Sequence, residues 1–240
     1  MGKLSELDLK WIHIARRDGI LQDIKSEALD FKDGIILMSC SDGDQFHNVY
    51  SYLAPIVAKQ AGFERIHPLP LNGGALVLAP GSPLNDLQAS ICSFLNDVLD
   101  DSLFGVFLNT LSPVVRPFGH LFRLDFPQLV QIWQAIRLKH IKTIVLSSHA
   151  PCGAAGLCCL SFPEILFYQS QAKRRLKRFF RHLNIRVPCL FHVDYGPVDE
   201  NKKKTRKRLY FTKTHLTDEW LLDNRLISRS IRLRSRVLPF

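Results

Sequence analysis

Metal-ligating side chains occur in two short turns of this sequence. Cys40 lies in "GIILMSCSDGDQF", and His149 and Cys152 lie in "KTIVLSSHAPCGAAG". Each turn follows an apolar run that is typical of a strand buried on both faces. Two thiolates and one imidazole form a ligand set that suits Zn²⁺, and a catalytic zinc keeps its fourth position open for water or substrate. A His-x-x-Cys pair alone is more often an ordinary turn, so the prediction of a zinc site depends on both turns together.

The apolar pattern predicts the elements that would bring these turns together. Short apolar runs predict four strands: "GIILMS", "GALVLAP", "TIVLSS" and "PCLFHVDYG". Helical spacing predicts helices over residues 3–30, with a break at Asp18-Gly19, and over about 84–101, 126–140 and 163–183. Strands that alternate with helices are expected of an α/β fold with a mainly parallel central sheet and flanking helices. In such a sheet Cys40 and His149 both lie at carboxyl ends of strands, where open parallel sheets carry their sites.

Composition and charge divide the chain unevenly. The 240 residues are 46% hydrophobic and 22% charged, which is typical of a soluble globular protein with one substantial core. We expect a zinc-binding α/β domain over residues 1–197, N-terminal helices included, and a basic C-terminal extension over 198–240. From Lys173 onward the chain has 19 Lys or Arg against 6 Asp or Glu, whereas residues 1–172 have 13 against 16. This basic region is either a solvated face or a contact for an anionic partner such as nucleic acid or a membrane surface.

The rest of the sequence contains no recognisable targeting signal and no second catalytic motif. No apolar window is long enough for a transmembrane segment and no signal peptide precedes the first helix, so we expect a cytoplasmic protein. Six cysteines without a disulfide framework fit that compartment. No phosphate-binding glycine loop and no Ser-His-Asp triad is recognised in the sequence. The remaining cysteines and histidines of interest are interpreted as core, capping or structural residues, with His47 also a candidate for lining the pocket: Cys92, Cys158, Cys159, Cys189, His47 and His192.

The two turns resemble the zinc motifs of the β-class carbonic anhydrases, Cys-x-Asp-x-Arg and His-x-x-Cys-Gly. Cys40-Ser41-Asp42 is similar to the first motif and His149 to Gly153 to the second, and the resemblance extends over residues 30 to about 197, where "GALVLAPGSPLN" would supply an intervening strand. The resemblance implies a zinc ion held by Cys40, His149 and Cys152. It also implies a lyase that reversibly hydrates CO₂ to bicarbonate by zinc-bound hydroxide. Because the family builds its active site at a subunit interface, a homodimer or higher oligomer is implied as well.

The sequence departs from the family pattern at position 44, which is Asp instead of Arg. In the family that Arg pairs with the motif Asp and orients it toward the bound water, which implies a catalytic role for Asp42. Without it, either Asp42 becomes a fourth zinc ligand and closes the site, or another arginine such as Arg65 or Arg116 replaces the missing partner. Two hypotheses follow: a carbonic anhydrase-like enzyme with reduced or altered activity, or a non-catalytic zinc-binding scaffold whose basic C-terminal region binds an anionic partner.

Overall fold

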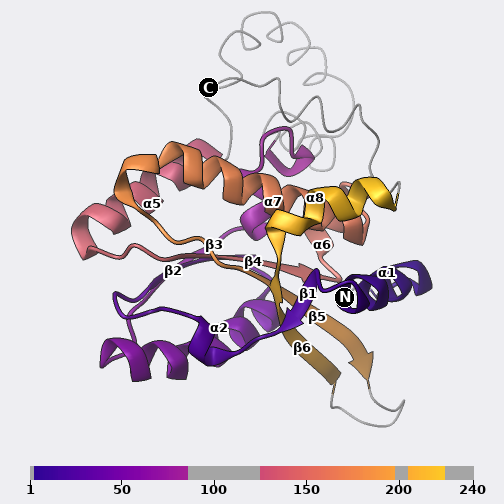
Figure 1. Cartoon of the computed structure of the whole chain (residues 1–240), viewed down its shortest axis with the longest axis horizontal. Coiled ribbons are helices and arrows are strands. Elements are labelled where there is room, and N and C mark those ends of the chain that lie inside the picture. The colour runs from indigo at the N-terminus through magenta and orange to yellow at the C-terminus, as the bar shows by residue number, and fades with distance from the viewer. Residues whose placement is uncertain (1–2, 86–124, 198–204, 225–240) are drawn as a thin grey trace, which may run out of the picture.

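A single mixed sheet organises the computed structural model, which describes residues 3–85, 125–197 and 205–224 (Figure 1). Within these residues the strand order is β1-β6-β5-β4-β2-β3. The strands are β1 (Leu21–Asp23), β2 (Ile35–Ser39), β3 (Ile66–Pro70), β4 (Ile144–Ala150), β5 (Cys189–Pro197) and β6 (Thr205–Thr212). The described helices are α1 (Glu6–Arg17), α2 (Gly43–Ala61), α5 (Asp125–Lys139), α6 (Gly153–Leu157), α7 (Phe162–Phe179) and α8 (Thr214–Asp223). Short 3₁₀ segments are η1 (Ser26–Ala28), η2 (Gly74–Leu78), η3 (Pro83–Asn85) and η5 (Arg181–Leu183).

The sheet is mainly parallel. β2 pairs in parallel with β3 on one side and with β4 on the other, and β4 pairs in parallel with β5. β6 runs antiparallel to β5, and β1 runs antiparallel to β6. The prediction of an α/β fold with a mainly parallel sheet and flanking helices is therefore confirmed.

Helices cover both faces of the sheet and create two apolar cores. Figure 1 shows α2 on one face and α5, α7 and α8 on the other. Because successive side chains of a strand point to opposite faces, β2 contributes to both cores. Ile36 and Met38 belong to the larger core with α7, whereas Ile35 and Leu37 belong to the smaller core with α2. A strand buried on both faces explains the uninterrupted apolar run "IILM".

Side-chain caps fix where the helices begin. Ser5 and Asp8 form a capping box at the start of α1, and Ser161 and Glu164 form another at the start of α7. Asp42 is the N-cap of α2, and its side chain accepts a hydrogen bond from the Gln45 backbone N–H at 3.4 Å. The residue that follows Cys40-Ser41 therefore starts a helix.

Two local predictions are wrong. "GALVLAP" does not form a strand: Gly73 and Gly74 have φ values of 80° and 53°, and the apolar residues that follow form the 3₁₀ segment η2. The strand beside β2 is instead β3. The predicted first helix ends at Arg17, and residues 21–23 form β1 because they pair with β6.

Other sequence-based elements agree with the structure. The strands predicted in "GIILMS", "TIVLSS" and "PCLFHVDYG" are β2, β4 and β5, and the helices predicted over 126–140 and 163–183 are α5 and α7. The predicted helix 84–101 lies almost wholly outside the described residues, as do Cys92 and Arg116. β6 and α8 come from the predicted C-terminal extension; the domain boundary at residue 197 stays a prediction. In the part of the chain that the structure describes, no helix has the length and apolar character needed to cross a bilayer.

Candidate metal centre

The two predicted turns meet where the direction of the strand order reverses. The chain passes from β2 to β3, which pairs with one side of β2, and β4 later pairs with the other side of β2. Connections that leave neighbouring strands toward opposite sides open a crevice at the carboxyl ends of those strands. Cys40 directly follows β2, His149 lies near the end of β4, and Cys152 is the N-cap of α6. The topology therefore brings both turns to one end of the sheet.

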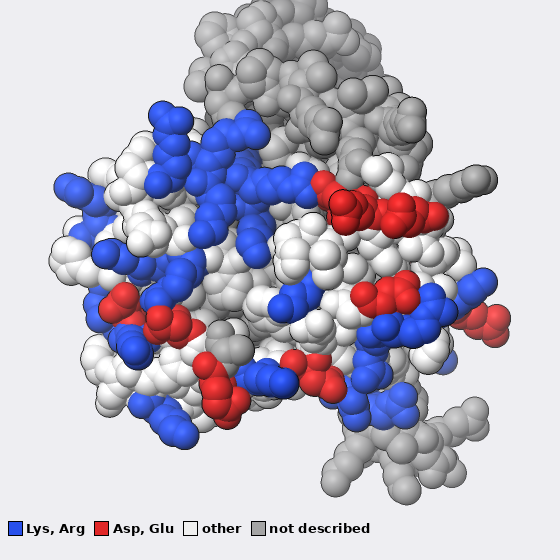
Figure 2. Space-filling view, viewed as in Figure 1, with Lys and Arg blue, Asp and Glu red and all other residues white. Residues whose placement is uncertain are grey.

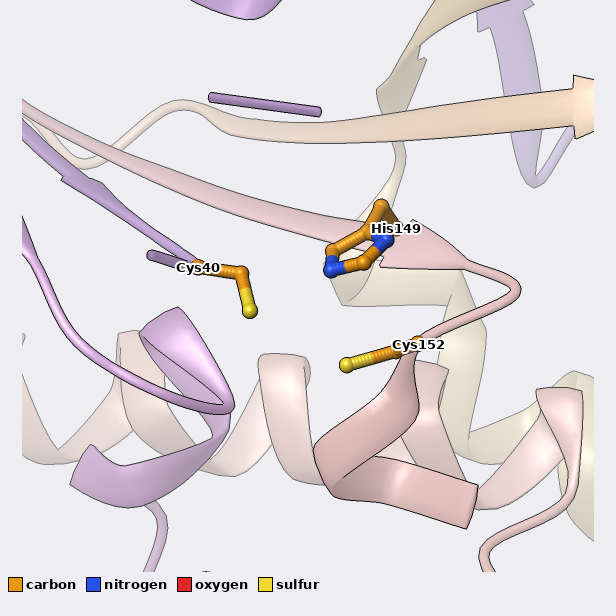
Figure 3. A group of neighbouring side chains, drawn as sticks. All are labelled: Cys40, His149 and Cys152. Atoms are coloured by element: carbon orange, nitrogen blue, oxygen red, sulfur yellow. The ribbon is translucent and has the colours of Figure 1, made fainter. Parts of the chain in front are cut away.

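Three side chains converge at this point. One ligand atom from each of Cys40, His149 and Cys152 lies within 4.8 Å of the other two, and all three residues are buried. Figure 3 shows both sulfur atoms and the imidazole ring turned toward a common space. Zn–S bonds of about 2.3 Å and Zn–N bonds of about 2.0 Å hold the ligand atoms of one ion within roughly 4.6 Å of one another. Small side-chain rotations would therefore suffice to bring these atoms around one ion.

The His149 ring offers an unused ligand atom. The residue is 4% exposed, and neither Nδ1 nor Nε2 has a hydrogen-bond partner among the described residues. An unpaired polar atom in the protein interior is costly, and most such atoms in native proteins have a partner. A metal ion bound between the two sulfurs would supply that partner, so the donor set and its burial fit Zn²⁺.

The pKa values of the two thiols are shifted in opposite directions. Hydrogen bonding with Cys152, and then the nearby His149, lowers the pKa of Cys40 to about 4, even though burial raises it. The pKa of Cys152 is raised, first by its hydrogen bond with Cys40 and then by burial. Without a metal ion, the two sulfurs therefore favour sharing a single proton. A divalent cation in the proton's place would allow both sulfurs to be thiolates, as metal binding requires.

Asp42 lies at the same end of the sheet but outside this group of three. Its half-buried carboxylate caps α2 through the Gln45 N–H, and Asp44 is exposed in the first helical turn. Arg65, which was considered as a replacement partner for Asp42, donates a hydrogen bond to the main-chain oxygen of Lys139 instead. Whether Asp42 has a catalytic role or is a fourth ligand stays a prediction.

The 3₁₀ segment η2 supports the Cys40 backbone. A Cβ atom added to Gly74 would lie 2.6 Å from the Cys40 nitrogen and 2.8 Å from the Ser39 carbonyl carbon. Only glycine allows this close approach at a positive φ. The segment thereby fixes the position of the backbone at Cys40.

Two further polar residues lie at this end of the fold. His192 is opposite His149 in the β4–β5 register and is 3% exposed, and its Nδ1 has no hydrogen-bond partner in the described part of the chain. Gln45 is 1% exposed, and neither end of its side-chain amide has a partner among the described residues. Neither residue is predicted from the sequence to belong to the site. The signal for Gln45 was present, because it occupies a polar position in the buried stripe of α2 that includes Val49, Leu53 and Val57.

The remaining candidates lie away from the group of three. Cys189 is fully buried in β5, as expected of a core residue. Cys158 is half-buried and Cys159 is exposed just after α6, so the interpretation of Cys159 as a core residue is wrong. The short α6 ends at Leu157, and its end brings the Cys159 side chain out of the core. His47 is exposed on α2 and lies 3.4 Å from the Ser51 hydroxyl.

Comparison of the chain with protein-family models, with curated proteins and with solved structures finds no match.

Proposed function

We propose that the protein binds Zn²⁺ through Cys40, His149 and Cys152 and acts as a carbonic anhydrase-like enzyme. The observation that carries the proposal is the buried convergence of two sulfurs and an unpaired imidazole at the carboxyl ends of two neighbouring parallel strands. A zinc ion in such a site would act as a Lewis acid and lower the pKa of bound water to about 7. The proposed reaction is the reversible hydration of CO₂ to bicarbonate.

The resemblance to the β-class carbonic anhydrases supports this choice of reaction. Its motif residues occur at the carboxyl ends of parallel strands, with Cys40 directly after β2 and His149 near the end of β4, and the second motif leads directly into α6. The proposal includes a homodimer or higher oligomer, which is the family's way of completing its active site. A cytoplasmic location also stays part of the proposal.

The N-terminal cap of α2 can hold Asp42 in place without the arginine of the family motif. Because the Asp42 carboxylate accepts the Gln45 N–H and is not one of the three grouped ligands, it has a tether that does not need an Arg at position 44. This supports a site with an open fourth position over a closed Cys₂-His-Asp site. We propose the Gln45 amide as a donor to an oxygen of bicarbonate because the residue follows Asp42 by three positions and its buried N–H groups have no partner among the described residues.

Metal content and CO₂ hydration of the purified protein test the two parts of the proposal separately. We expect about one zinc per chain and measurable hydration by stopped-flow indicator assay. Cys152→Ser should lose most of the zinc and the activity, whereas Cys158→Ser, which alters a nearby cysteine outside the group, should keep both. Wild-type protein without bound metal would contradict the zinc site. Zinc without hydration would instead favour the non-catalytic scaffold.

Asp44→Arg distinguishes an incomplete enzyme from a scaffold. An Arg in this exposed position would restore the family's partner for Asp42, and residues that orient a metal site typically change its activity by about 10–100-fold. We therefore expect hydration to rise by about tenfold at unchanged zinc content. An unchanged but measurable rate would show that the Gln45 N–H is a sufficient tether for Asp42. A zinc-loaded variant as inactive as the wild type would favour the scaffold, with the basic C-terminal region as its contact for an anionic partner.

A further inference from the structure

A second candidate site lies between α1 and the β5–β6 hairpin. It is a cavity of about 280 Å³ that shares no residue with the metal centre. One wall is a single face of α1, including Leu9, Ile12 and Arg16 at helical spacing. The opposite wall comes from alternate residues of β6, Arg206 and Arg208, which point to the same side of the sheet.

The lining of this cavity is strongly cationic. Arg16, Arg206 and Arg208 all line it, and none of the described Asp or Glu residues does. Among the described residues none of these three guanidinium groups forms an ion pair with a carboxylate. Like charges that face one cavity repel each other, and a bound anion would remove that repulsion.

Aromatic rings hold two of the guanidinium groups in position. Arg16 lies over the Tyr210 ring and Arg206 over the Tyr195 ring, each at 5.1 Å from the ring centroid. The Tyr195 and Tyr210 hydroxyls are hydrogen-bonded to each other at 2.8 Å, and Tyr210 is fully buried. Stacking of this kind orients the planar donor groups before a ligand arrives, which lowers the entropy cost of binding.

We propose that this cavity binds the phosphate group of a small organic phosphate. Planar guanidinium groups pair with phosphate oxygens through two parallel hydrogen bonds, and three of them suit a dianionic or trianionic group. Leu9 and Ile12 give the cavity an apolar part that would receive the organic portion of the ligand. The inference does not depend on the chemistry at the metal centre.

The shape of the charge distribution favours a compact ligand over a nucleic acid strand. A strand needs a continuous basic groove with several phosphate contacts. Figure 2 shows a larger gathering of Lys and Arg over α7, in another part of this view from α1 and the β5–β6 hairpin. Arg206 and Arg208 belong to the basic run "KKKTRKR", so the described part of that run lines a cavity of limited volume.

Calorimetric titration with inorganic phosphate and pyrophosphate, at constant ionic strength, tests the proposal. We expect saturable binding of pyrophosphate near one per chain, tighter than that of phosphate because it brings more negative charge. Arg16→Gln and Arg208→Gln should each weaken it by about tenfold. Arg17→Gln makes the same charge change one residue along α1, outside the cavity, and should leave the affinity within about twofold. Cys152→Ser should bind pyrophosphate as the wild type does, which excludes binding at a metal ion.

Several outcomes would overturn this inference. Absence of pyrophosphate binding by the folded wild type would do so, as would an Arg17→Gln variant weakened as much as Arg16→Gln. A single-stranded oligonucleotide that binds more tightly than pyrophosphate and is not displaced by it would assign the charge to a nucleic acid surface instead. Circular dichroism and melting temperature establish that each variant is folded, so that loss of binding in Arg16→Gln and Arg208→Gln is attributable to the cavity.

Discussion

His192 is a buried histidine with no charged neighbour strong enough to keep it protonated. Burial, followed by the charge of His149, lowers its pKa from 6.5 to about 4. Its Nδ1 has no hydrogen-bond partner among the described residues. The folded protein therefore holds a neutral imidazole here at pH values where an unfolded chain would bind a proton.

The His192 shift predicts a loss of stability in acid. Between pH 6.5 and about 4 the unfolded state binds more protons than the folded state, so the free energy of unfolding should fall as the pH falls, by on the order of 3 kcal/mol over the full interval. His192→Gln should show a flatter dependence, measured by urea unfolding of protein treated with EDTA so that metal loss does not contribute. His47→Gln, at an exposed position, should keep the wild-type slope; equal slopes for His192→Gln and wild type would contradict the prediction.

Single residues of the site differ in how well the sequence reveals them. Cys40, His149 and Cys152 were predictable because each follows an apolar run that must be a buried strand, and parallel strands end at the same edge. The position of Asp42 was not, because a carboxylate after a strand serves equally as a ligand or as a helix cap. His192 became a candidate only through its burial, whereas Gln45 also has a sequence signal as a polar position in the apolar stripe of α2.

Among the elements that carry none of the three ligands, η2 lies close to the Cys40 backbone, and Gly74 tests this contact. Gly74→Ala would place a methyl group 2.6 Å from the Cys40 nitrogen at a φ of 53°. We expect the free energy of unfolding to fall by about 2 kcal/mol or more and zinc affinity to drop, because the backbone at Cys40 must move. Chemical denaturation and a competition titration with a zinc chelator measure the two effects.

Gly156→Ala is the matched control for this substitution. Gly156 is exposed in α6, and an added Cβ would meet no atom within 4 Å. Alanine is favoured over glycine in a helix by about 0.5–1 kcal/mol, so this variant should be slightly more stable than the wild type. A Gly74→Ala variant as stable as Gly156→Ala would show that η2 can move away from Cys40 without cost.

The wrongly predicted elements have a common physical origin in the position of each strand in the sheet. β3 contains Pro68 and Pro70, which a central strand would not tolerate, but among the described strands it lies at the edge and pairs only with β2. The apolar run "GALVL" looked more like a strand, yet it is buried as a 3₁₀ segment beneath α7 after two glycines of positive φ. No strand is predicted for β6, because its charged residues make the segment part of a basic run. In the structure these residues face outward or line the cationic cavity.

For the molecule as a whole, a bound zinc ion would connect parts of the chain that are far apart in sequence. Cys40 and His149 are separated by 109 positions and lie on neighbouring strands. A ligand that binds only the folded state stabilises it, by about 4 kcal/mol at a thousand times its dissociation constant. We expect a chelator to lower the melting temperature of the wild type, measured by calorimetry, and to leave Cys152→Ser unchanged. An equal fall in melting temperature for both proteins would show that the chelator does not act through a metal ion at Cys152.

The pairing of β1 with β6 has a consequence for the order of folding during synthesis. Leu21 pairs with Thr212, so the N-terminal edge of the sheet is completed only after nearly the whole described chain has left the ribosome. Until then the long β5 presents an open edge, and unpaired edges are templates for association with other chains. A chain that stops near residue 197 would keep that edge permanently. Premature termination is therefore expected to yield aggregates instead of a smaller folded protein.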